Sequence, residues 1–541
     1  MGKVAVIGID GGMLKLVEQW QDELPNFRRI MQNGVYGELE STFPPLTCPA
    51  WPSMFTGKNP GKLGIFDFNK YRADKGGEFS INSSLDYASS ALWKILNSYG
   101  KKAGIFNLPF TFPPHKVDSF MVCGVGSPDV MKANYTYPLE LQKTLNEVVG
   151  GYEIVPLILL GIQGKEEQYI KVLEGMLGKR EKAASYLLAN MPWDLFVGVF
   201  YILDAAQHYF WHHMDQNHTR PGDKRYQDVI KRFYIKVDGA IGRFLEQVPE
   251  DTNVLVVSDH GFGPIHGYFM VNQWLENNNF LRFKDKIHQK RLGVSLRRIR
   301  DFLMSYLSPR LSQLVADLLP RAVARKITFG IAQRDNMAAL CQSIDWSRTK
   351  AYGMGMVGMI YINLKGREPW GTVEPGEEYE AVRDEIIAKL KQIIDPETGK
   401  TVDIQVFKKE ELYHGQYFEL APDILYKMAR YDQSLLLKDK AEWRRAHFSG
   451  WHVQEGMFMG WGPDIDKSGR KLSGLRIYDI SPTILHLFGL PVPQDMDGRV
   501  LTEIFQEESE PGRREVTYQE VDYETERIKH IVRKLKTQKQ L

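Results

Sequence analysis

The sequence contains few cysteines, almost no net charge and no long apolar run. Its three cysteines, Cys48, Cys123 and Cys341, are odd in number and far apart, which argues against a disulfide framework and favours a reducing compartment. The formal net charge of +2 argues against binding of a nucleic-acid polymer. A membrane-spanning helix needs about 18 consecutive apolar residues, and the sequence offers none. The first residues predict a strand rather than a signal peptide, so we expect a cytoplasmic protein.

Apolar, β-branched runs alternate along the chain with segments of helical period. The strand-like runs are 4–9, 103–106, 195–203 and 254–258, and the helix-like segments include 24–33, 89–99 and 225–247. This alternation predicts an α/β fold with a central, mostly parallel sheet and helices on both faces. A hydrophobic content of 43% is ordinary for a globular protein with a buried core.

The chain divides into two core parts that are separated by a long insertion. We expect a first core part at 1–275, an inserted cap at 276–445, a second core part at 446–511 and a polar C-terminal tail at 512–541. Within the first part, residues 112–185 combine proline-rich loops with a helical region and are a candidate wall of a pocket.

The segment 282–326 is strongly basic. It carries twelve Lys or Arg residues against three Asp residues, with apolar residues in between. One interpretation is an amphipathic helix that contacts anionic lipid or an anionic substrate. The other, which we favour, is a solvated helix that packs on the core through its apolar face. Peripheral contact with a membrane therefore stays an open alternative.

Carboxylate and imidazole side chains follow three of the strand-like runs. Asp10 ends the first run, Asp204 follows the third, and Asp259 comes directly after the fourth. Ligands in open α/β sheets gather at the carboxyl ends of strands, so these positions can form one site. The full set offers six nitrogen or oxygen ligands, enough for two metal ions: Asp10, Asp204, His208, Asp259, His260 and His452. Asp204 and His208 are four residues apart, so a pair on a helix surface is the alternative for them.

Thr47 lies in the stretch Thr47-Cys48-Pro49. Proline is favoured in the first turn of a helix, which would make Thr47 or Cys48 the N-cap. The free backbone N–H groups of that helix would then face an alkoxide or a phosphate. An ordinary N-cap threonine is the alternative interpretation.

These residues resemble the alkaline phosphatase superfamily and, within it, the type I phosphodiesterase/nucleotide pyrophosphatase family. That family has its nucleophilic threonine in a Thr-x-Pro motif, followed by Thr-Gly, a proline and Gly-Ile. The corresponding residues here are Thr47-Cys48-Pro49, Thr56-Gly57, Pro60 and Gly64-Ile65. The resemblance implies an alkaline phosphatase-like core with a large inserted cap.

The resemblance also implies a set of roles. Asp204, His208 and His452 would hold one divalent ion. The residues implied for the other ion are Asp10, Thr47, Asp259 and His260. A mixed set of imidazole and carboxylate ligands fits Zn²⁺ best and also suits Mn²⁺. Thr47 would attack phosphorus, so we expect a phosphohydrolase that cleaves a phosphodiester or pyrophosphate bond through a phosphothreonine.

Three other functions remain on the same scaffold: a phosphotransferase or phosphomutase, a phosphomonoesterase, and a binding protein without catalysis. The substrate is expected to be a phosphorylated small molecule or a lipid-linked phosphate. In the family an asparagine contacts the phosphate, and counting from the nucleophile places it at Phe68, beside Asn69. Asn69 and His266 are therefore candidate substrate contacts.

Overall fold

The structure is a computed structural model of the chain. It describes residues 2–72, 78–87, 90–126, 133–154, 165–284, 340–433 and 441–520. Of the basic segment 282–326, everything from residue 285 onward lies outside the described residues, as does the C-terminal tail from residue 521.

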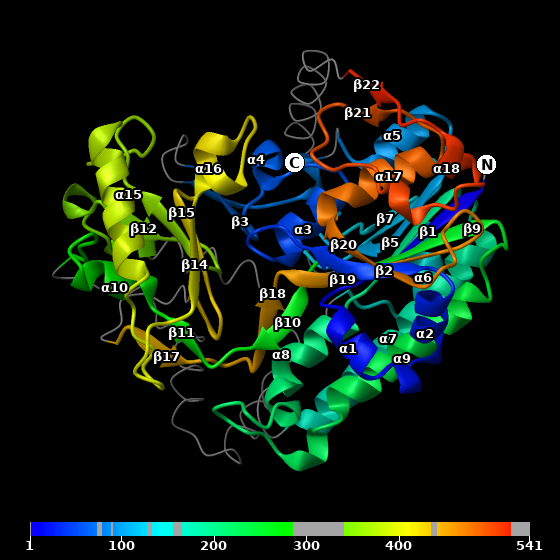
Figure 1. The fold of residues 1–541 in the computed structure, drawn as a ribbon, viewed down its shortest axis with the longest axis horizontal. Coiled ribbons are helices and arrows are strands. Elements are labelled where there is room, and N and C mark those ends of the chain that lie inside the picture. Colours follow the sequence, from blue (N-terminus) through cyan, green and yellow to red (C-terminus); the bar gives the residue numbers. More distant parts are fainter. Residues whose placement is uncertain are drawn as a thin grey trace.

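A nine-stranded sheet forms the centre of the larger unit (Figure 1). Strand β1 (Lys3–Ile9) lies between β9 (Thr252–Val257) and β8 (Leu195–Phe200) and is parallel to both. The sheet order is β20-β2-β19-β9-β1-β8-β5-β6-β7. The remaining strands are β2 (Val35–Glu40), β5 (Ala103–Leu108), β6 (Phe120–Cys123), β7 (Thr136–Tyr137), β19 (Glu455–Trp461) and β20 (Arg470–Arg476). Only β19 and β7 run antiparallel to their neighbours, so the predicted mostly parallel sheet is confirmed.

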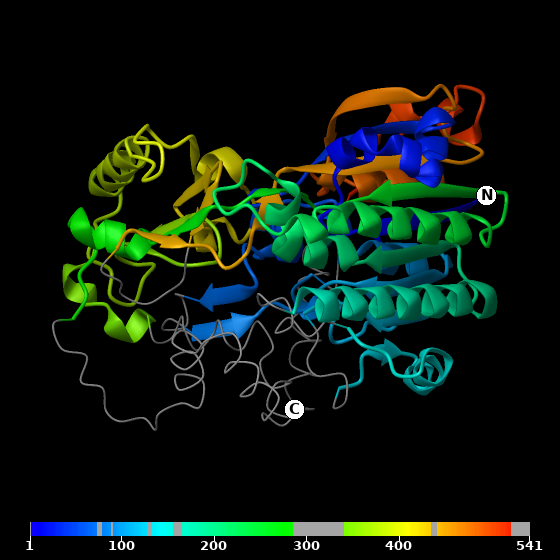
Figure 2. The same ribbon diagram turned by 90° about the horizontal axis from the view of Figure 1, so that it is seen from below.

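Both faces of the sheet are buried at its central strands β9, β1, β8 and β5, which explains why these strands have no polar alternation. In β1, Ala5, Ile7 and Ile9 face one core, while Val4 and Val6 face the other. Figure 2 shows the long helices of the first face running side by side. The helices of that face are α1 (Leu14–Gln19), α2 (Pro25–Gln32), α6 (Leu141–Val149), α7 (Glu166–Asn190), α8 (Ile202–Met214) and α9 (Val229–Leu245). The second face is covered by α3 (Thr47–Met54), α5 (Leu92–Ser98) and α17 (Ile480–Leu487).

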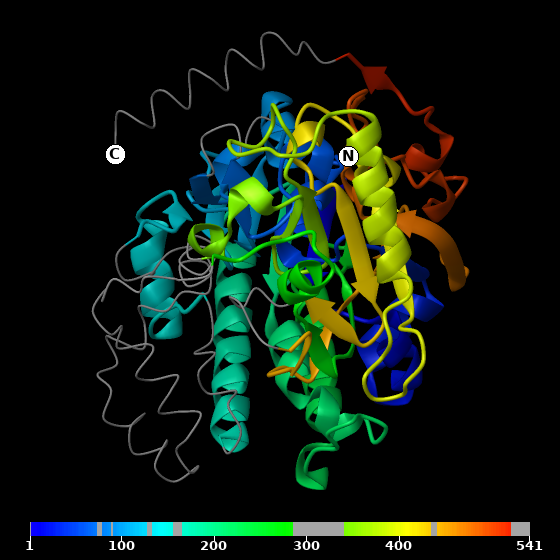
Figure 3. The same ribbon diagram turned by 90° about the vertical axis from the view of Figure 1, so that its left-hand side faces the viewer.

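A smaller unit lies beside the large sheet (Figures 1 and 3). Its centre is an antiparallel sheet in the order β12-β13-β15-β14, with strands β12 (Ala351–Gly353), β13 (Met359–Ile362), β15 (Ile424–Met428) and β14 (Ile404–Lys408). The helices of this part are α10 (Val271–Asn277), α15 (Glu377–Leu390) and α16 (Lys409–Leu412). A third apolar cluster fills this unit.

Two short ladders connect the units. Strand β10 (Gly261–Pro264) pairs with β18 (Gly450–Val453), and β11 (Gly267–Phe269) lies between β16 (Tyr431–Gln433) and β17 (Trp443–Arg445). The other described elements are α4 (Pro60–Leu63), α18 (Glu510–Arg513), β3 (Asn69–Arg72), β4 (Glu78–Ile81), β21 (Val492–Pro493) and β22 (Tyr518–Gln519).

The structure places one segment differently from the expectation. The run 195–203 is a strand only to Phe200, because α8 begins at Ile202 and takes the last apolar residues into a helix. Within 112–185, strands β6 and β7 extend the central sheet, and the role of this region as a pocket wall stays a prediction. The domain boundaries themselves stay a prediction. Among the described residues, every helix is too short or too polar to cross a bilayer.

Candidate metal centre

The central strands deliver the candidate ligands to one edge of the sheet. Asp10 follows β1, and Asp259 follows β9 after one residue. Asp204 lies in the first turn of α8, directly after β8. Since β9, β1 and β8 are parallel neighbours, their carboxyl ends meet. His452 arrives from β18, whose register pairs it with Phe262.

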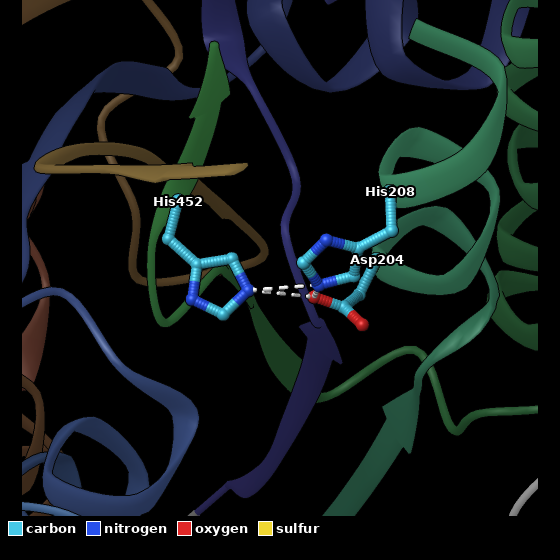
Figure 4. A group of neighbouring side chains, drawn as sticks. All are labelled: Asp204, His208 and His452. Atoms are coloured by element: carbon cyan, nitrogen blue, oxygen red, sulfur yellow. Dashed lines mark hydrogen bonds and ion pairs between the residues drawn. The ribbon is translucent and has the colours of Figure 1, made fainter. Parts of the chain in front are cut away.

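Asp204, His208 and His452 form the first ligand group, and their side chains point toward one another (Figure 4). His452 Nε2 lies 3.2 Å from Asp204 Oδ1 and 3.1 Å from His208 Nε2, and His208 Nε2 lies 3.4 Å from Asp204 Oδ1. Two ligands of a tetrahedral zinc ion at about 2.1 Å stand about 3.4 Å apart. The three atoms therefore have the spacing that one ion requires.

In each of the three site histidines, the ring nitrogen Nδ1 faces a backbone carbonyl. His208 Nδ1 lies 3.0 Å from the Gly450 carbonyl, and His452 Nδ1 lies 3.2 Å from the Pro45 carbonyl. His260 Nδ1 lies 3.2 Å from the carbonyl of the next residue. Donation from Nδ1 to a carbonyl leaves Nε2 as a lone-pair ligand in each ring, as metal-binding histidines require.

Thr47, Asp10, Asp259 and His260 make up the second ligand group. His260 Nε2 lies 3.2 Å from Thr47 Oγ1, 3.2 Å from Asp259 Oδ2 and 3.7 Å from Asp10 Oδ1. Asp10, Asp204 and His260 also offer ligand atoms within 4.8 Å of one another. Asp204 thus belongs to both sets, and the two groups are adjacent.

In each carboxylate of the second group, one oxygen accepts a hydrogen bond and the other does not. The Gly11 amide donates to Asp259 Oδ1 at 3.2 Å, and Trp51 Nε1 donates to Asp10 Oδ2 at 3.1 Å. Asp259 Oδ2 and Asp10 Oδ1 are buried and have no hydrogen-bond partner among the described residues. A buried charged oxygen without a donor is costly unless a cation binds it, so the residues present fit a divalent ion.

Two glycines make this geometry accessible. A Cβ at Gly8 would lie 2.6 Å from the Trp51 ring, so glycine lets α3 pack closely over β1 and bring the indole to Asp10. Gly11 has a φ of 70°, a left-handed conformation that turns its amide toward Asp259.

The electrostatics of the two groups differ. Burial and the charges of Asp259 and Asp204 raise the pKa of Asp10, and burial with Asp204 raises the pKa of Asp259. Burial opposes ionisation of Asp204 too, but His208 and His452 hold its pKa below the usual range. Burial lowers the pKa of His260 and of His452, which favours the neutral imidazole that binds metal.

Thr47 occupies the first position of α3. The N-cap is Leu46, so the expectation that Thr47 or Cys48 caps the helix is wrong by one or two residues. Pro49 is tolerated because the first turn of a helix makes no intrahelical N–H bonds. Thr47 is only 4% exposed, and its hydroxyl points to the second ligand group.

The two candidate substrate contacts have other neighbours in the structure, and their role in substrate binding stays a prediction. Asn69 begins β3 and lines a cavity of about 20 Å³ with Asp67 and Lys70, which has room for about one water. His266 Nδ1 lies 3.3 Å from Glu397 Oε2.

Asp204 and His208 are four residues apart on one helix, as the alternative interpretation expects. That helix starts at the carboxyl end of β8, so the two residues are at the same time placed as ligands beside the sheet.

Sequence reasoning missed the partners that orient the ligands. The indole N–H of Trp51 donates to Asp10, and no sequence pattern assigned that contact to Trp51. The carbonyls of Pro45 and Gly450 have no side-chain signature, so only the fold reveals them.

The chain matches the sequence profile of the type I phosphodiesterase / nucleotide pyrophosphatase family over residues 4–453. No curated protein sequence matches significantly. Similar solved structures include murine ectonucleotide pyrophosphatase / phosphodiesterase 5, with a TM-score of 0.49 and 14% identity, covering 93% of this chain and 100% of that one. The human protein of the same name gives 0.47 and 13%, covering 92% and 97%. An inactive murine variant in complex with AMP gives 0.47 and 15%, covering 91% and 96%.

The family match spans most of the chain and includes every residue of the two ligand groups. The fold around them is a mostly parallel sheet that is covered by helices. The chain belongs to the type I phosphodiesterase / nucleotide pyrophosphatase family.

Proposed function

We propose that this protein is a two-metal phosphohydrolase that cleaves a phosphodiester or pyrophosphate bond through a phosphothreonine at Thr47. One observation carries the proposal: a buried threonine hydroxyl lies 3.2 Å from a ligand nitrogen of His260, beside two adjacent ligand groups. An ordinary helix-start threonine needs no such neighbours.

Asp204, His208 and His452 would hold one ion, and Asp10, Asp259, His260 and Thr47 the other. The ions, when bound, would favour the alkoxide of the threonine and stabilise the charge that develops on the phosphoryl oxygens. The imidazole-rich first group favours Zn²⁺, with Mn²⁺ as the second choice.

Thr47 Oγ1 would attack phosphorus as the bond from phosphorus to the leaving-group oxygen breaks. The leaving group takes up the threonine proton and departs as an alcohol or a phosphate, and the substituted phosphoryl group stays on Thr47. Water then attacks the same phosphorus, the Thr47 Oγ1–phosphorus bond breaks, one water proton returns to threonine, and the phosphate product is released. The start of α3 places free backbone N–H groups beside the reacting hydroxyl, which favours the anionic transition state.

Phosphoryl transfer to an alcohol is the second candidate. The enclosure of the site favours it, because Thr47 is 4% exposed and the His260 side chain is fully buried. A site that excludes bulk water lets a bound acceptor compete with hydrolysis.

A phosphorylated small molecule is the proposed substrate. A nucleotide is a reasonable first choice, since one structurally similar protein was solved in complex with AMP. A lipid-linked phosphate remains the alternative. We also propose a cytoplasmic location, which the three free thiols support because a reducing compartment keeps cysteines unpaired.

Hydrolysis of bis-p-nitrophenyl phosphate and p-nitrophenyl phosphate by Zn²⁺- or Mn²⁺-loaded protein tests the proposal. Thr47→Ala should reduce diester cleavage at least about 1,000-fold. Cys48→Ser is the matched control: its thiol donates to the Asp67 carbonyl and should be dispensable. Diesterase activity that survives in Thr47→Ala would exclude the phosphothreonine. Preference for the monoester would indicate a phosphatase, and turnover only with an added alcohol would indicate the transferase.

A further inference from the structure

The loop that follows α8 folds back and reaches the segment that carries His452. Two residues of this loop, His218 and Arg220, make the connection. His218 Nε2 lies 3.1 Å from the Ile265 carbonyl, and the Arg220 amide donates to His218 Nδ1 at 3.0 Å. The Arg220 guanidinium then donates from Nη2 to the Phe448 carbonyl at 2.8 Å.

The segment Phe448–Gly450 surrounds the metal ligand His208. The Ser449 amide donates to the His208 carbonyl at 2.8 Å, and the Gly450 carbonyl lies 3.0 Å from His208 Nδ1. The Phe448 ring packs against the His208 imidazole, with 4.7 Å between the ring centroids. The rings of Phe262 and Trp451 also pack against His208, but this segment supplies both of these backbone hydrogen bonds and one of the ring contacts that orient it.

Arg220 makes its side-chain hydrogen bond to a backbone carbonyl rather than to an acidic side chain. Among the described residues it forms no ion pair, and its Nε is buried without a hydrogen-bond partner. Burial and the neighbouring Arg445 lower the pKa of Arg220, whereas Tyr268 and Glu397 raise it. Because a guanidinium stays protonated in proteins, its bond to the Phe448 carbonyl is a charge-assisted hydrogen bond in a partly buried place, where such bonds are strong.

We propose that Arg220 is a positioning residue for the metal ligand His208. By holding the Phe448 carbonyl it fixes the segment Phe448–Gly450, and that segment fixes the ring plane and the tautomer of the imidazole. The inference rests on the proposed function in one respect, the presence of an ion at Asp204, His208 and His452. Loss of such an outer hydrogen bond weakens metal affinity by about 10- to 100-fold in other proteins.

Zinc titration of the metal-free protein against a chromophoric chelator tests the inference without any assay of turnover. Arg220→Met should weaken one of two zinc sites about 10- to 100-fold and leave the other within about twofold. Arg220→Lys should restore part of that affinity, since an ammonium group can donate to the same carbonyl. Arg225→Met is the control, because Arg225 lies near the same loop, is 76% exposed and pairs only with Asp223.

Reference variants identify which site changes. The weakened site in Arg220→Met should be the one that disappears in His208→Ala and persists in Asp259→Ala. In Co²⁺-loaded protein, the visible absorption of that same site should shift, as expected for a reoriented imidazole.

Unchanged zinc affinities in a folded Arg220→Met protein would overturn the inference and leave the proposed function intact. Equal weakening of both sites, with a lowered unfolding temperature, would also overturn it, because it would indicate a general structural role. Wild-type protein that binds no divalent ion would instead remove the proposed function and this inference together.

Discussion

The two ligand groups lie side by side and differ in how they balance charge. In the first, Asp204 is flanked by His208 and His452, which hold its carboxyl pKa low. In the second, Asp10 and Asp259 share one histidine, and burial with the charges of neighbouring carboxylates, Asp204 among them, raises the pKa of both. The first group can therefore persist without metal, whereas in the second the ionised form is disfavoured until a cation binds.

The two groups also differ in their neighbours. In the first group, the imidazole of His452 on β18 contacts Asp204 and His208 on α8. The second group has two carboxylate oxygens without a hydrogen-bond partner among the described residues, and it lies next to Thr47, the proposed nucleophile. Three predictions bear on this comparison.

Loss of a ligand from either group should have the largest effect. We expect Asp259→Ala and His452→Ala each to lower diester hydrolysis at least about 1,000-fold, because in the proposed mechanism both ions act on one phosphoryl group. Each variant should retain one bound ion, measured by elemental analysis after dialysis. Two retained ions in either variant would contradict the assignment of ligands to groups.

Replacement of Asp259 or of Asp204 by asparagine should change the stability of the metal-free protein in opposite directions. Asp259→Asn should raise its free energy of unfolding at pH 7, and Asp204→Asn should lower it, each by about 1–3 kcal/mol. The raised pKa of Asp259 means that its ionisation disfavours the folded state, a cost that is absent below about pH 4 and grows as pH rises. The lowered pKa of Asp204 gives stability that is complete above about pH 4 and is lost as pH falls below it.

Urea unfolding in the presence of a chelator, at pH 5 and pH 7, measures both effects. The gain in Asp259→Asn should be larger at pH 7, and the loss in Asp204→Asn should be similar at the two values. Changes of the same sign in both variants would show that the groups do not differ in charge balance.

The smallest effect should come from the indole that supports Asp10. Trp51→Phe removes the 3.1 Å hydrogen bond to Asp10 Oδ2 and keeps an aromatic ring over Gly8. We expect about tenfold weaker zinc binding at the second group and no change at the first. Calorimetric titration would separate the two sites, and weakening at the first group alone would contradict the prediction.

Much of this fold was predictable, because buried parallel strands have an obvious sequence pattern. The runs at 4–9 and 254–258 correspond to β1 and β9 with shifts of one or two residues. The end of β8 was less predictable, since the apolar residues after Phe200 belong to a buried helix that looks the same by composition. The helix start at Thr47 was missed for a related reason: a buried Leu46 serves as the N-cap without a side-chain hydrogen bond.

The part of the candidate site that consists of ligand side chains was predictable from the sequence, and the part that consists of backbone contacts was not. The expected ligands lie together in the structure, because each follows a strand or a ladder that ends at the same edge. The roles of Asn69, which begins β3, and of His266, which lies beside Glu397, stay predictions. The role proposed for Arg220 could not be predicted from the sequence. Arg220 acts by a hydrogen bond to a backbone carbonyl of a segment that lies more than two hundred residues away along the chain.

The antiparallel ladder between β10 and β18 has a consequence for biosynthesis. It places Phe262 opposite His452, so the last ligand reaches the site only after the whole intervening unit has left the ribosome. A nascent chain that ends before residue 452 has the crowded carboxylates of Asp10 and Asp259 but lacks the imidazole that completes the neighbouring group. Capture of an ion by the first group would therefore be a late event of synthesis, and an ion bound there would mark a chain that has been extended beyond residue 452.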